Sequence, residues 1–110
     1  MAGTAAPVQK VASWYGEEHR GRLMANGQKF DPDKLTAASW FYPLGTRVRV
    51  STEDGRSVIV TITDRGPAKR LVRAGRVIDL SQAAFSHLAP LDYGLVPVQV
   101  EVVQAVVEAA

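Results

Sequence analysis

The sequence predicts a mainly β domain, and three observations lead to this prediction. Short runs rich in valine, isoleucine and threonine alternate with polar residues, which is the two-residue period of a strand with one buried face. Glycine, asparagine, aspartate and proline separate these runs at short intervals, as turn residues do. The 110 residues give enough chain for one domain with a single core. We therefore expect many short strands around one core, with one or two short helices.

A hairpin is the clearest single element, with arms at residues 47–52 and 56–63. Residues Glu53, Asp54 and Gly55 lie between the arms, and an Asp-Gly pair is a strong signal for a hairpin turn. In both arms the aliphatic residues alternate with polar ones, so one face of each arm is expected in the core. The residues on this face are Val48 and Val50 in the first arm and Val58, Val60 and Ile62 in the second.

Three further elements follow the hairpin. A strand is expected at residues 76–78, and a helix is expected from about residue 81 to residue 88. Either Asp79 or Ser81 can cap the first amides of this helix, and a proline marks its end. The last strand is expected at residues 96–103, where valines again alternate with polar residues.

The composition is that of a folded, nearly neutral domain. Hydrophobic residues make up 46% of the chain and charged residues 22%, which excludes the composition of a disordered protein. The formal net charge of +2 is too small to indicate nucleic-acid binding, although it suits an anionic polymer. We expect residues 1–7 to form a flexible N-terminal segment, residues 8–104 to form the domain and residues 105–110 to form a C-terminal tail.

The chain offers few clues to its compartment. It has no cysteine, so it has neither a disulfide framework nor a thiolate metal site. No run of residues has the apolar length of a membrane span, and the first ten residues lack the basic-then-apolar order of a secretory signal. Two interpretations stay open: a cytosolic protein, or the mature part of an exported protein, which we favour.

Four blocks of sequence follow one another along the chain. They are Ala12-Ser13-Trp14-Tyr15-Gly16; Gly21-Arg22 with Ala25-Asn26-Gly27; Leu35-Thr36-Ala37-Ala38 with Pro43-Leu44-Gly45-Thr46-Arg47-Val48; and Asp64-Arg65-Gly66-Pro67 with Arg76-Val77-Ile78-Asp79-Leu80-Ser81. In order and spacing, these blocks resemble the rare lipoprotein A (RlpA) family from about residue 11 to residue 103. The resemblance implies a six-stranded double-psi β-barrel with a surface groove. It also implies export to the bacterial cell envelope, periplasmic or outer-membrane-associated, with a lipid anchor possible upstream.

In active RlpA relatives the implied activity is lytic cleavage of peptidoglycan glycan strands. A side chain protonates the glycosidic oxygen, and a base accepts the proton of the sugar 6-hydroxyl, which closes an anhydro ring. Neither a metal nor another cofactor is needed. The implied partners are glycan strands and an envelope or division protein, without nucleic acid.

Asp64 is the candidate catalytic residue. It follows a buried strand, and the Gly66-Pro67 pair fixes the turn beyond it, so its carboxyl group is expected at the end of the strand. An ordinary aspartate is almost fully ionised at pH 7, so action as an acid requires burial or a neighbouring negative charge. The alternative is a turn aspartate that accepts hydrogen bonds from nearby amides or pairs with Arg65.

Two positions depart from the pattern of active relatives. These relatives usually carry a glutamate after the Asn-Gly turn and a histidine after the Thr-Ala-Ala segment, whereas this chain has Gln28 and Ser39. Neither side chain exchanges a proton as the usual one does, and loss of one acid-base partner typically lowers the rate about a hundredfold to ten-thousandfold. We therefore expect weakened or lost cleavage.

The segment after Gly16 also differs, because the family's usual Phe-His-Gly is His19-Arg20-Gly21 here. We expect Glu17, Glu18 and Arg20 to form a solvated loop. The alternative is that Glu17, Glu18 or His19 leans into the groove and replaces a missing group.

The remaining candidate residues would bind substrate. Trp14, Tyr15 and Trp40 could stack on sugar rings, although core packing is the commoner role of an aromatic side chain. Trp40, Phe41 and Tyr42 follow one another, so at least one of them is expected to be exposed. Asp79 could also serve the groove, because related expansin and endoglucanase barrels carry an aspartate in this segment, but helix capping with Gln82 is the interpretation we favour. The substrate-binding set is Trp14, Tyr15, Asn26, Trp40, Arg65 and Asp79.

Three functions remain open. We favour an RlpA-like domain that binds peptidoglycan glycan strands and whose cleavage activity is weakened or lost. The first alternative is an active lytic transglycosylase that uses Asp64 as its acid and base. The second is a protein-interaction or inhibitor module, because one fold can carry different functions.

Overall fold

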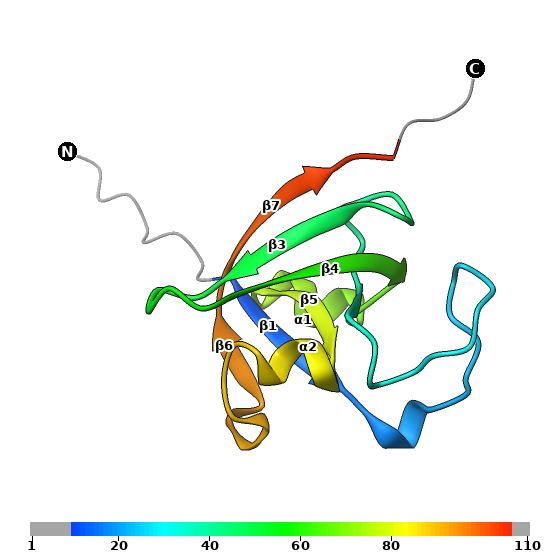
Figure 1. Cartoon of the computed structure of the whole chain (residues 1–110), viewed down its shortest axis with the longest axis horizontal. Helices are drawn as coiled ribbons and strands as arrows, with labels where there is room; N and C mark the ends of the chain where they lie inside the picture. Colours follow the sequence, from blue (N-terminus) through cyan, green and yellow to red (C-terminus); the bar gives the residue numbers. More distant parts are fainter. Residues whose placement is uncertain (1–9, 107–110) are drawn as a thin grey trace.

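A single hydrogen-bonded sheet makes up most of the computed structural model, which describes residues 10–106 (Figure 1). The predicted N-terminal segment, residues 1–7, and the last four residues of the predicted tail lie outside the described residues. Within the described part, the strands are β1 (Val11–Tyr15), β2 (Thr36–Ala38), β3 (Arg47–Ser51), β4 (Ser57–Asp64), β5 (Arg76–Ser81), β6 (Leu95–Pro97) and β7 (Gln99–Gln104). The helices are α1 (Lys69–Arg73) and α2 (Gln82–Ser86), with 3-10 turns η1 (Glu17–His19) and η2 (Leu91–Tyr93).

The order of the strands in the sheet is β6-β1-β5-β2-β4-β3-β7. Two pairs, β1 with β5 and β2 with β4, are parallel, and the other neighbours are antiparallel. The outermost strands β6 and β7 are consecutive in the chain and are separated only by Val98. The sheet therefore curls until its two edges meet at one bent segment (Figure 1). Counted as one bent strand, β6 and β7 reduce the seven strands of the described part to the six that the family resemblance implies.

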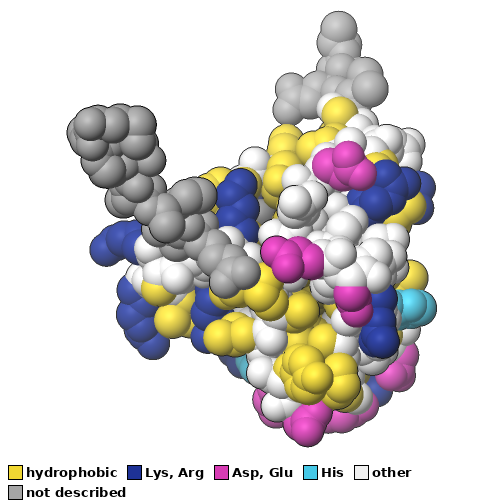
Figure 2. Space-filling model, turned by 90° about the vertical axis from the view of Figure 1, so that its left-hand side faces the viewer, with side chains coloured by type: hydrophobic (Ala, Val, Ile, Leu, Met, Phe, Trp, Pro, Cys, Tyr) yellow, Lys and Arg dark blue, Asp and Glu magenta, His cyan; other side chains and the backbone are white. Residues whose placement is uncertain are grey.

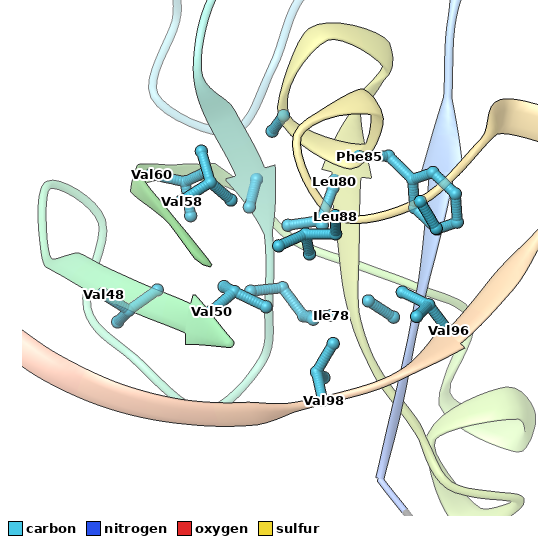
Figure 3. Close-up of a cluster of buried hydrophobic side chains, with 14 of the residues drawn as sticks. Val48, Val50, Val58, Val60, Ile78, Leu80, Phe85, Leu88, Val96 and Val98 are labelled. Atoms are coloured by element: carbon cyan, nitrogen blue, oxygen red, sulfur yellow. The ribbon is translucent and has the colours of Figure 1, made fainter. Parts of the chain in front are cut away.

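The barrel interior is filled by aliphatic side chains from every part of the sheet and by α2 (Figure 3). The predicted alternation in the hairpin is confirmed, because the aliphatic faces of β3 and β4 are buried. Phe85 of α2 and Ile62 of β4 are among the largest fully buried side chains. Burial of such a side chain contributes about 1.5–3 kcal/mol to folding, so this core holds the ends of the strands in place.

The segment around β5 and α2 differs from the prediction. The strand that we expect at residues 76–78 continues to Ser81, and α2 begins at the next residue. Ser81 is the N-cap, because its Oγ accepts a hydrogen bond from Ala84 N at 3.2 Å. The preferred interpretation of Asp79 as a helix cap is therefore wrong: Asp79 lies inside the strand, two residues too early to reach the first amides of the helix. The sequence pattern does not predict helix α1. The helix has only five residues, and its N-cap position is an alanine, which has no capping side chain.

Candidate functional site

Two adjoining clefts lie where β1 and β4 end. The first has a volume of about 350 Å³ and the second about 270 Å³, and we call them together the groove. Tyr15, His19 and Asp64 line both clefts. The first cleft is also lined by Trp14, Glu18, Ala38, Arg65, Gly66, Pro67, Ala68 and Asp79, and the second by Arg22, Leu23, Met24 and Phe30.

Asp64 is the last residue of β4, and its two carboxylate oxygens have different surroundings. Oδ1 accepts hydrogen bonds from Ala25 N at 2.9 Å and from Arg65 N at 2.8 Å. Oδ2 has no hydrogen-bond partner within residues 10–106 and is not among the buried polar atoms there. The amide hydrogen bonds of the turn alternative are therefore present, but they occupy only one oxygen. The second oxygen is open to the groove.

Asp79 is the other aspartate of the groove, and β5 places it beside β1. One of its oxygens accepts a hydrogen bond from Ser13 Oγ at 3.0 Å. Burial raises the pKa of Asp79, and the Asp64 charge acts in the same direction, although Ser13, Arg76 and His19 oppose the shift. Because burial disfavours a charged carboxylate, Asp79 is better suited than an exposed aspartate to hold a proton.

Tyr15 projects from the end of β1 into the space that these two carboxyl groups share. Its ring stacks on Phe30, with 4.3 Å between the ring centroids. Its hydroxyl group is buried and has no hydrogen-bond partner within the described residues. Burial raises the pKa of this phenol, and the charges of Asp64 and Asp79 raise it further. Tyr15 therefore stays a neutral hydroxyl, which can donate a hydrogen bond to a ligand or carboxylate that comes within reach.

Neither Asn26 nor Gln28 lines the groove, although the turn that carries them is bound to the end of β4. Asn26 N donates to Thr63 O at 3.1 Å, next to the bond between Ala25 N and Asp64. The two side chains pair with each other, because Asn26 Nδ2 donates to Gln28 Oε1 at 3.2 Å. This turn therefore positions Asp64 through its backbone, and no contact places the Gln28 amide in the groove.

Ser39 also lies outside the groove lining and is fully buried. Its Oγ accepts a hydrogen bond from Phe41 N at 3.0 Å, and its amide donates to Asp64 O at 3.0 Å. The side chain thus shapes the loop after β2, whereas a histidine there would add a large ring to a filled position. At this position the chain has a structural hydroxyl group and no proton carrier.

The guanidinium group of Arg65 does not pair with Asp64. Its Nη1 donates to Ser39 O at 2.8 Å and to Tyr42 O at 2.7 Å, which joins the aromatic loop to the end of β4. Within that loop, Trp40 Nε1 donates to Pro67 O at 2.6 Å, and Lys69 Nζ lies 4.8 Å from the Trp40 ring centroid. The expected exposure is confirmed for Trp40 and Phe41, whereas Tyr42 packs against the core. Trp40 therefore stands at the rim of the groove, next to Pro67.

Turn η1 divides the four residues that the sequence groups together. Glu17 and Arg20 are exposed, and Arg20 Nη2 lies 2.6 Å from Glu17 Oε1, as expected for a solvated loop. Glu18 is exposed as well, but both Glu18 and His19 line the first cleft. The replacement of a missing group by either residue stays a prediction.

Two partners of the site were missed by sequence reasoning. Ser13 holds Asp79, and the Ala25 amide holds Asp64. A signal for Ser13 was present, because residues 13 and 15 share one face of a strand in the first sequence block. The Ala25 contact joins residues 39 positions apart, and no local pattern indicates it.

The described residues contain neither a membrane-spanning helix nor a cluster of metal ligands. In residues 10–106 no helix is long and apolar enough to cross a membrane. Over the same range, no group of three or more histidine, aspartate or glutamate side chains could hold a metal ion.

Fold and groove together define the class of the molecule: a double-psi β-barrel domain with a groove that contains two aspartates. The lytic transglycolase family profile matches residues 8–100. The chain belongs to this family of RlpA-like domains.

Similar proteins extend the comparison. The chain is 48% identical over 97 residues to the probable endolytic peptidoglycan transglycosylase RlpA of Nostoc sp., covering 86% of this chain and 25% of that protein. It is 39% identical over 93 residues to the endolytic peptidoglycan transglycosylase RlpA of Vibrio cholerae, covering 84% of this chain and 34% of that protein. The chain thus spans about a quarter to a third of the length of these two relatives.

Solved structures share the fold. The Streptomyces papain inhibitor superposes with a TM-score of 0.68 at 31% identity, covering 87% of this chain and 93% of the inhibitor. An expansin of Clavibacter michiganensis superposes with a TM-score of 0.66 at 22% identity, covering 92% of this chain and 52% of the expansin. At this low identity, the similarity to the expansin supports the assignment of the fold only.

Proposed function

We propose that this chain is a peptidoglycan-binding domain of the bacterial cell envelope, which holds glycan strands in the groove and cleaves them weakly or not at all. The observation that carries the proposal is the position of Asp64, whose Oδ2 opens into a cleft of about 350 Å³ beside Asp79 and Tyr15. A carboxylate in such a cleft can accept hydrogen bonds from sugar hydroxyls. Trp14 and the rim residue Trp40 supply aromatic rings on which a sugar can stack.

The expected weakness in cleavage follows from the proton carriers. Lytic cleavage breaks the C1–O4 bond of the glycan: one group protonates O4, another accepts the 6-hydroxyl proton, and O6 bonds to C1. Burial favours a protonated Asp79, so this residue can supply the first proton. Active relatives of the family usually carry a glutamate and a histidine at the positions of Gln28 and Ser39. Neither Gln28 nor Ser39 can exchange a proton as those side chains do. Binding therefore persists where turnover is reduced.

The test measures binding and cleavage separately. For binding, the purified protein is incubated with peptidoglycan sacculi, which are then sedimented. For cleavage, the protein is incubated with peptide-free glycan strands, and mass spectrometry detects anhydro ends. The proposal predicts sedimentation with sacculi and few or no anhydro products. Rapid release of anhydro products would instead support the fully active transglycosylase. Protein that stays in the supernatant would contradict the proposal.

Asp64→Asn tests the part played by the carboxylate. The amide oxygen of the substituted side chain can still accept the two backbone hydrogen bonds, so the fold should persist. Any anhydro product should decrease, because the groove loses the Asp64 charge that helps Asp79 to hold its proton. Asp54→Asn, in the β3–β4 turn away from the groove, is the matched control and should leave product release unchanged.

A second candidate function is inhibition of a protease. The similarity to the Streptomyces papain inhibitor favours this candidate, because the matched region covers 93% of the inhibitor. The RlpA relatives, in contrast, are three to four times longer than the region that matches this chain. Inhibition of papain by the purified protein, together with no sedimentation on sacculi, would support this candidate and contradict the glycan proposal.

A further inference from the structure

His19 occupies a position that the family pattern does not explain. Relatives usually carry phenylalanine at this position of the Phe-His-Gly segment, and a histidine at the position of Ser39. This chain therefore lacks the usual histidine in the loop after β2 and has a different one in turn η1. The two loops are far apart in the sequence, but η1 borders the same groove as Asp64.

The ring of His19 is held by two neighbours. It lies edge-on to Tyr15, with 5.6 Å between the ring centroids and an angle of 88° between the planes. Nδ1 lies 3.3 Å from Glu18 Oε1, and this nitrogen is buried. Nδ1 has no hydrogen-bond partner within residues 10–106, so this contact is mainly electrostatic. The carboxylate of Glu18 thus favours a proton on Nδ1 of the imidazole ring.

The second ring nitrogen has a different environment. Nε2 has no hydrogen-bond partner within residues 10–106 and is not among the buried polar atoms there. Because the ring lines both clefts, this nitrogen is the polar atom that His19 offers to the groove. A carboxylate at Nδ1 with Nε2 open is the arrangement in which histidine acts as a base.

Charge links His19 to the carboxyl groups on the other side of the groove. His19 lowers the pKa of Asp79, which opposes the effect of burial. The ring therefore lies within electrostatic reach of Asp79. The charged and titratable groups that face it are Glu18 on its own turn, Tyr15 of β1, Asp64 and Arg65 at the end of β4, Asp79 of β5 and Arg22 of the next loop.

We propose that His19, oriented by Glu18, is the base of the groove and takes over the proton-carrying role that Ser39 cannot perform. This inference rests on the proposed glycan function and explains any residual cleavage. The sugar 6-hydroxyl gives its proton to His19 Nε2, O6 bonds to C1, the C1–O4 bond breaks and Asp79 gives its proton to O4. Exchange with solvent then returns a proton to Asp79 and removes one from His19. No water enters the products, and the electron pairs balance.

The experiment compares three variants over pH 5 to 8, using peptide-free glycan strands and the appearance of anhydro ends. His19→Phe introduces the family's residue and keeps a ring against Tyr15, so the fold should persist. Glu18→Gln removes the charge that orients the ring. Glu17→Gln is the matched control, because Glu17 is the neighbouring carboxylate and pairs with Arg20 outside the groove.

The wild-type rate should rise with pH, because a base must be free of its own proton before it can accept that of the 6-hydroxyl. His19→Phe should lower the rate about a hundredfold and abolish this rise, and Glu18→Gln should lower it about tenfold or less. Glu17→Gln should match the wild type. A His19→Phe protein that keeps the wild-type rate and pH profile overturns the inference, as does a wild type that releases no anhydro ends at any pH.

Sedimentation with sacculi, measured on the same samples, separates the two proposals. Binding without any product overturns the role of His19 and leaves the proposed function standing, whereas loss of binding contradicts the proposed function itself. Ring-proton NMR gives a readout that needs no turnover. Glycan strands should move the His19 signals and leave those of His87, an exposed histidine after α2, unchanged. Unmoved His19 signals on a sample that binds glycan would also overturn the inference.

Discussion

The two ends of the barrel carry clefts of similar size, but they place their aspartates in opposite environments. The cleft at the end of β4 measures about 350 Å³ and contains the largely buried Asp79. The cleft at the β3–β4 turn measures about 370 Å³ and contains Asp54, which is exposed. Figure 2 shows this second end, where hydrophobic side chains gather with acidic and basic ones around them.

Cleft size does not distinguish the two ends, because the cleft at the β3–β4 turn and the first cleft of the groove have nearly equal volumes. At the β3–β4 turn, Asp54 accepts a hydrogen bond from the Thr52 hydroxyl, which lowers its pKa, and Arg56 lies 3.4 Å away and acts in the same direction. Such a carboxylate is stably ionised and already paired. In the groove, burial raises the pKa of Asp79, and Asp64 keeps one oxygen open. Chemical environment, and not volume, therefore distinguishes the candidate site.

The largest predicted effect concerns the core that supports the groove end. Phe85→Ala should lower the free energy of unfolding by about 3–5 kcal/mol, because this fully buried ring fills the space between α2 and Trp14. Leu95→Ala, at a half-exposed position on β6, should change it by only about 0.5 kcal/mol. Urea unfolding measures both. Equal effects of the two substitutions would contradict the described packing.

A smaller effect is expected from the exposed aromatic residues at the two ends. Trp40→Ala should weaken binding to sacculi about tenfold, or by ~1.4 kcal/mol, because the ring at the groove rim loses its stacking surface. Tyr93→Ala removes an exposed aromatic ring from the opposite cleft and should leave binding unchanged. Sedimentation at graded sacculus concentrations measures both affinities. A larger loss for Tyr93→Ala would move the binding site to the other end of the barrel.

The smallest predicted effects are changes in melting temperature when an aspartate at either end of the barrel is replaced by asparagine, and the two changes have opposite signs. Burial raises the pKa of Asp79 in the folded protein above its pKa in the unfolded chain. The stability of the fold therefore decreases as the pH rises from the unfolded-state pKa to the folded-state pKa, and it stays lower at higher pH. Asp79→Asn removes this penalty and should raise the melting temperature at pH 7. The pKa of Asp54 is lowered, so its contribution is present above the unfolded pKa and is lost as pH falls.

Asp54→Asn should therefore lower the melting temperature slightly at pH 7 and leave it unchanged in acid. Thermal unfolding from pH 3 to pH 8 measures both variants against the wild type. A fall in melting temperature at pH 7 for Asp79→Asn would mean that the charged form of Asp79 is stabilised in the folded protein.

Local sequence patterns predict the hairpin, the buried faces of β3 and β4 and the position of Asp64 at a strand end. Each of these depends on residues that are neighbours in the sequence, where strand periodicity and turn residues are informative. The roles of Asp79 and Arg65 could not be found in this way. Asp79 meets Ser13 across 66 positions, and the Arg65 guanidinium joins a loop 23 to 26 positions away.

The position of His19 depends on tertiary structure in the same way. Its sequence neighbours Glu17, Glu18 and Arg20 are all charged, which favours the prediction of a solvated loop. Only the packing of η1 against Tyr15 separates Glu18 and His19, which line the groove, from Glu17 and Arg20, which do not. Resemblance to a family locates such a segment, but the side-chain contacts decide its chemistry.

Amide chemical-shift mapping with peptide-free glycan strands tests the central claim most directly. If the groove binds sugar, the amide signals of Ala25 and Arg65, which both donate to Asp64 Oδ1, should move, while those of Thr52 and Arg56 at the opposite end stay fixed. Shifts confined to the β3–β4 turn, or no shifts at saturating glycan, would contradict a glycan site at the end of β4.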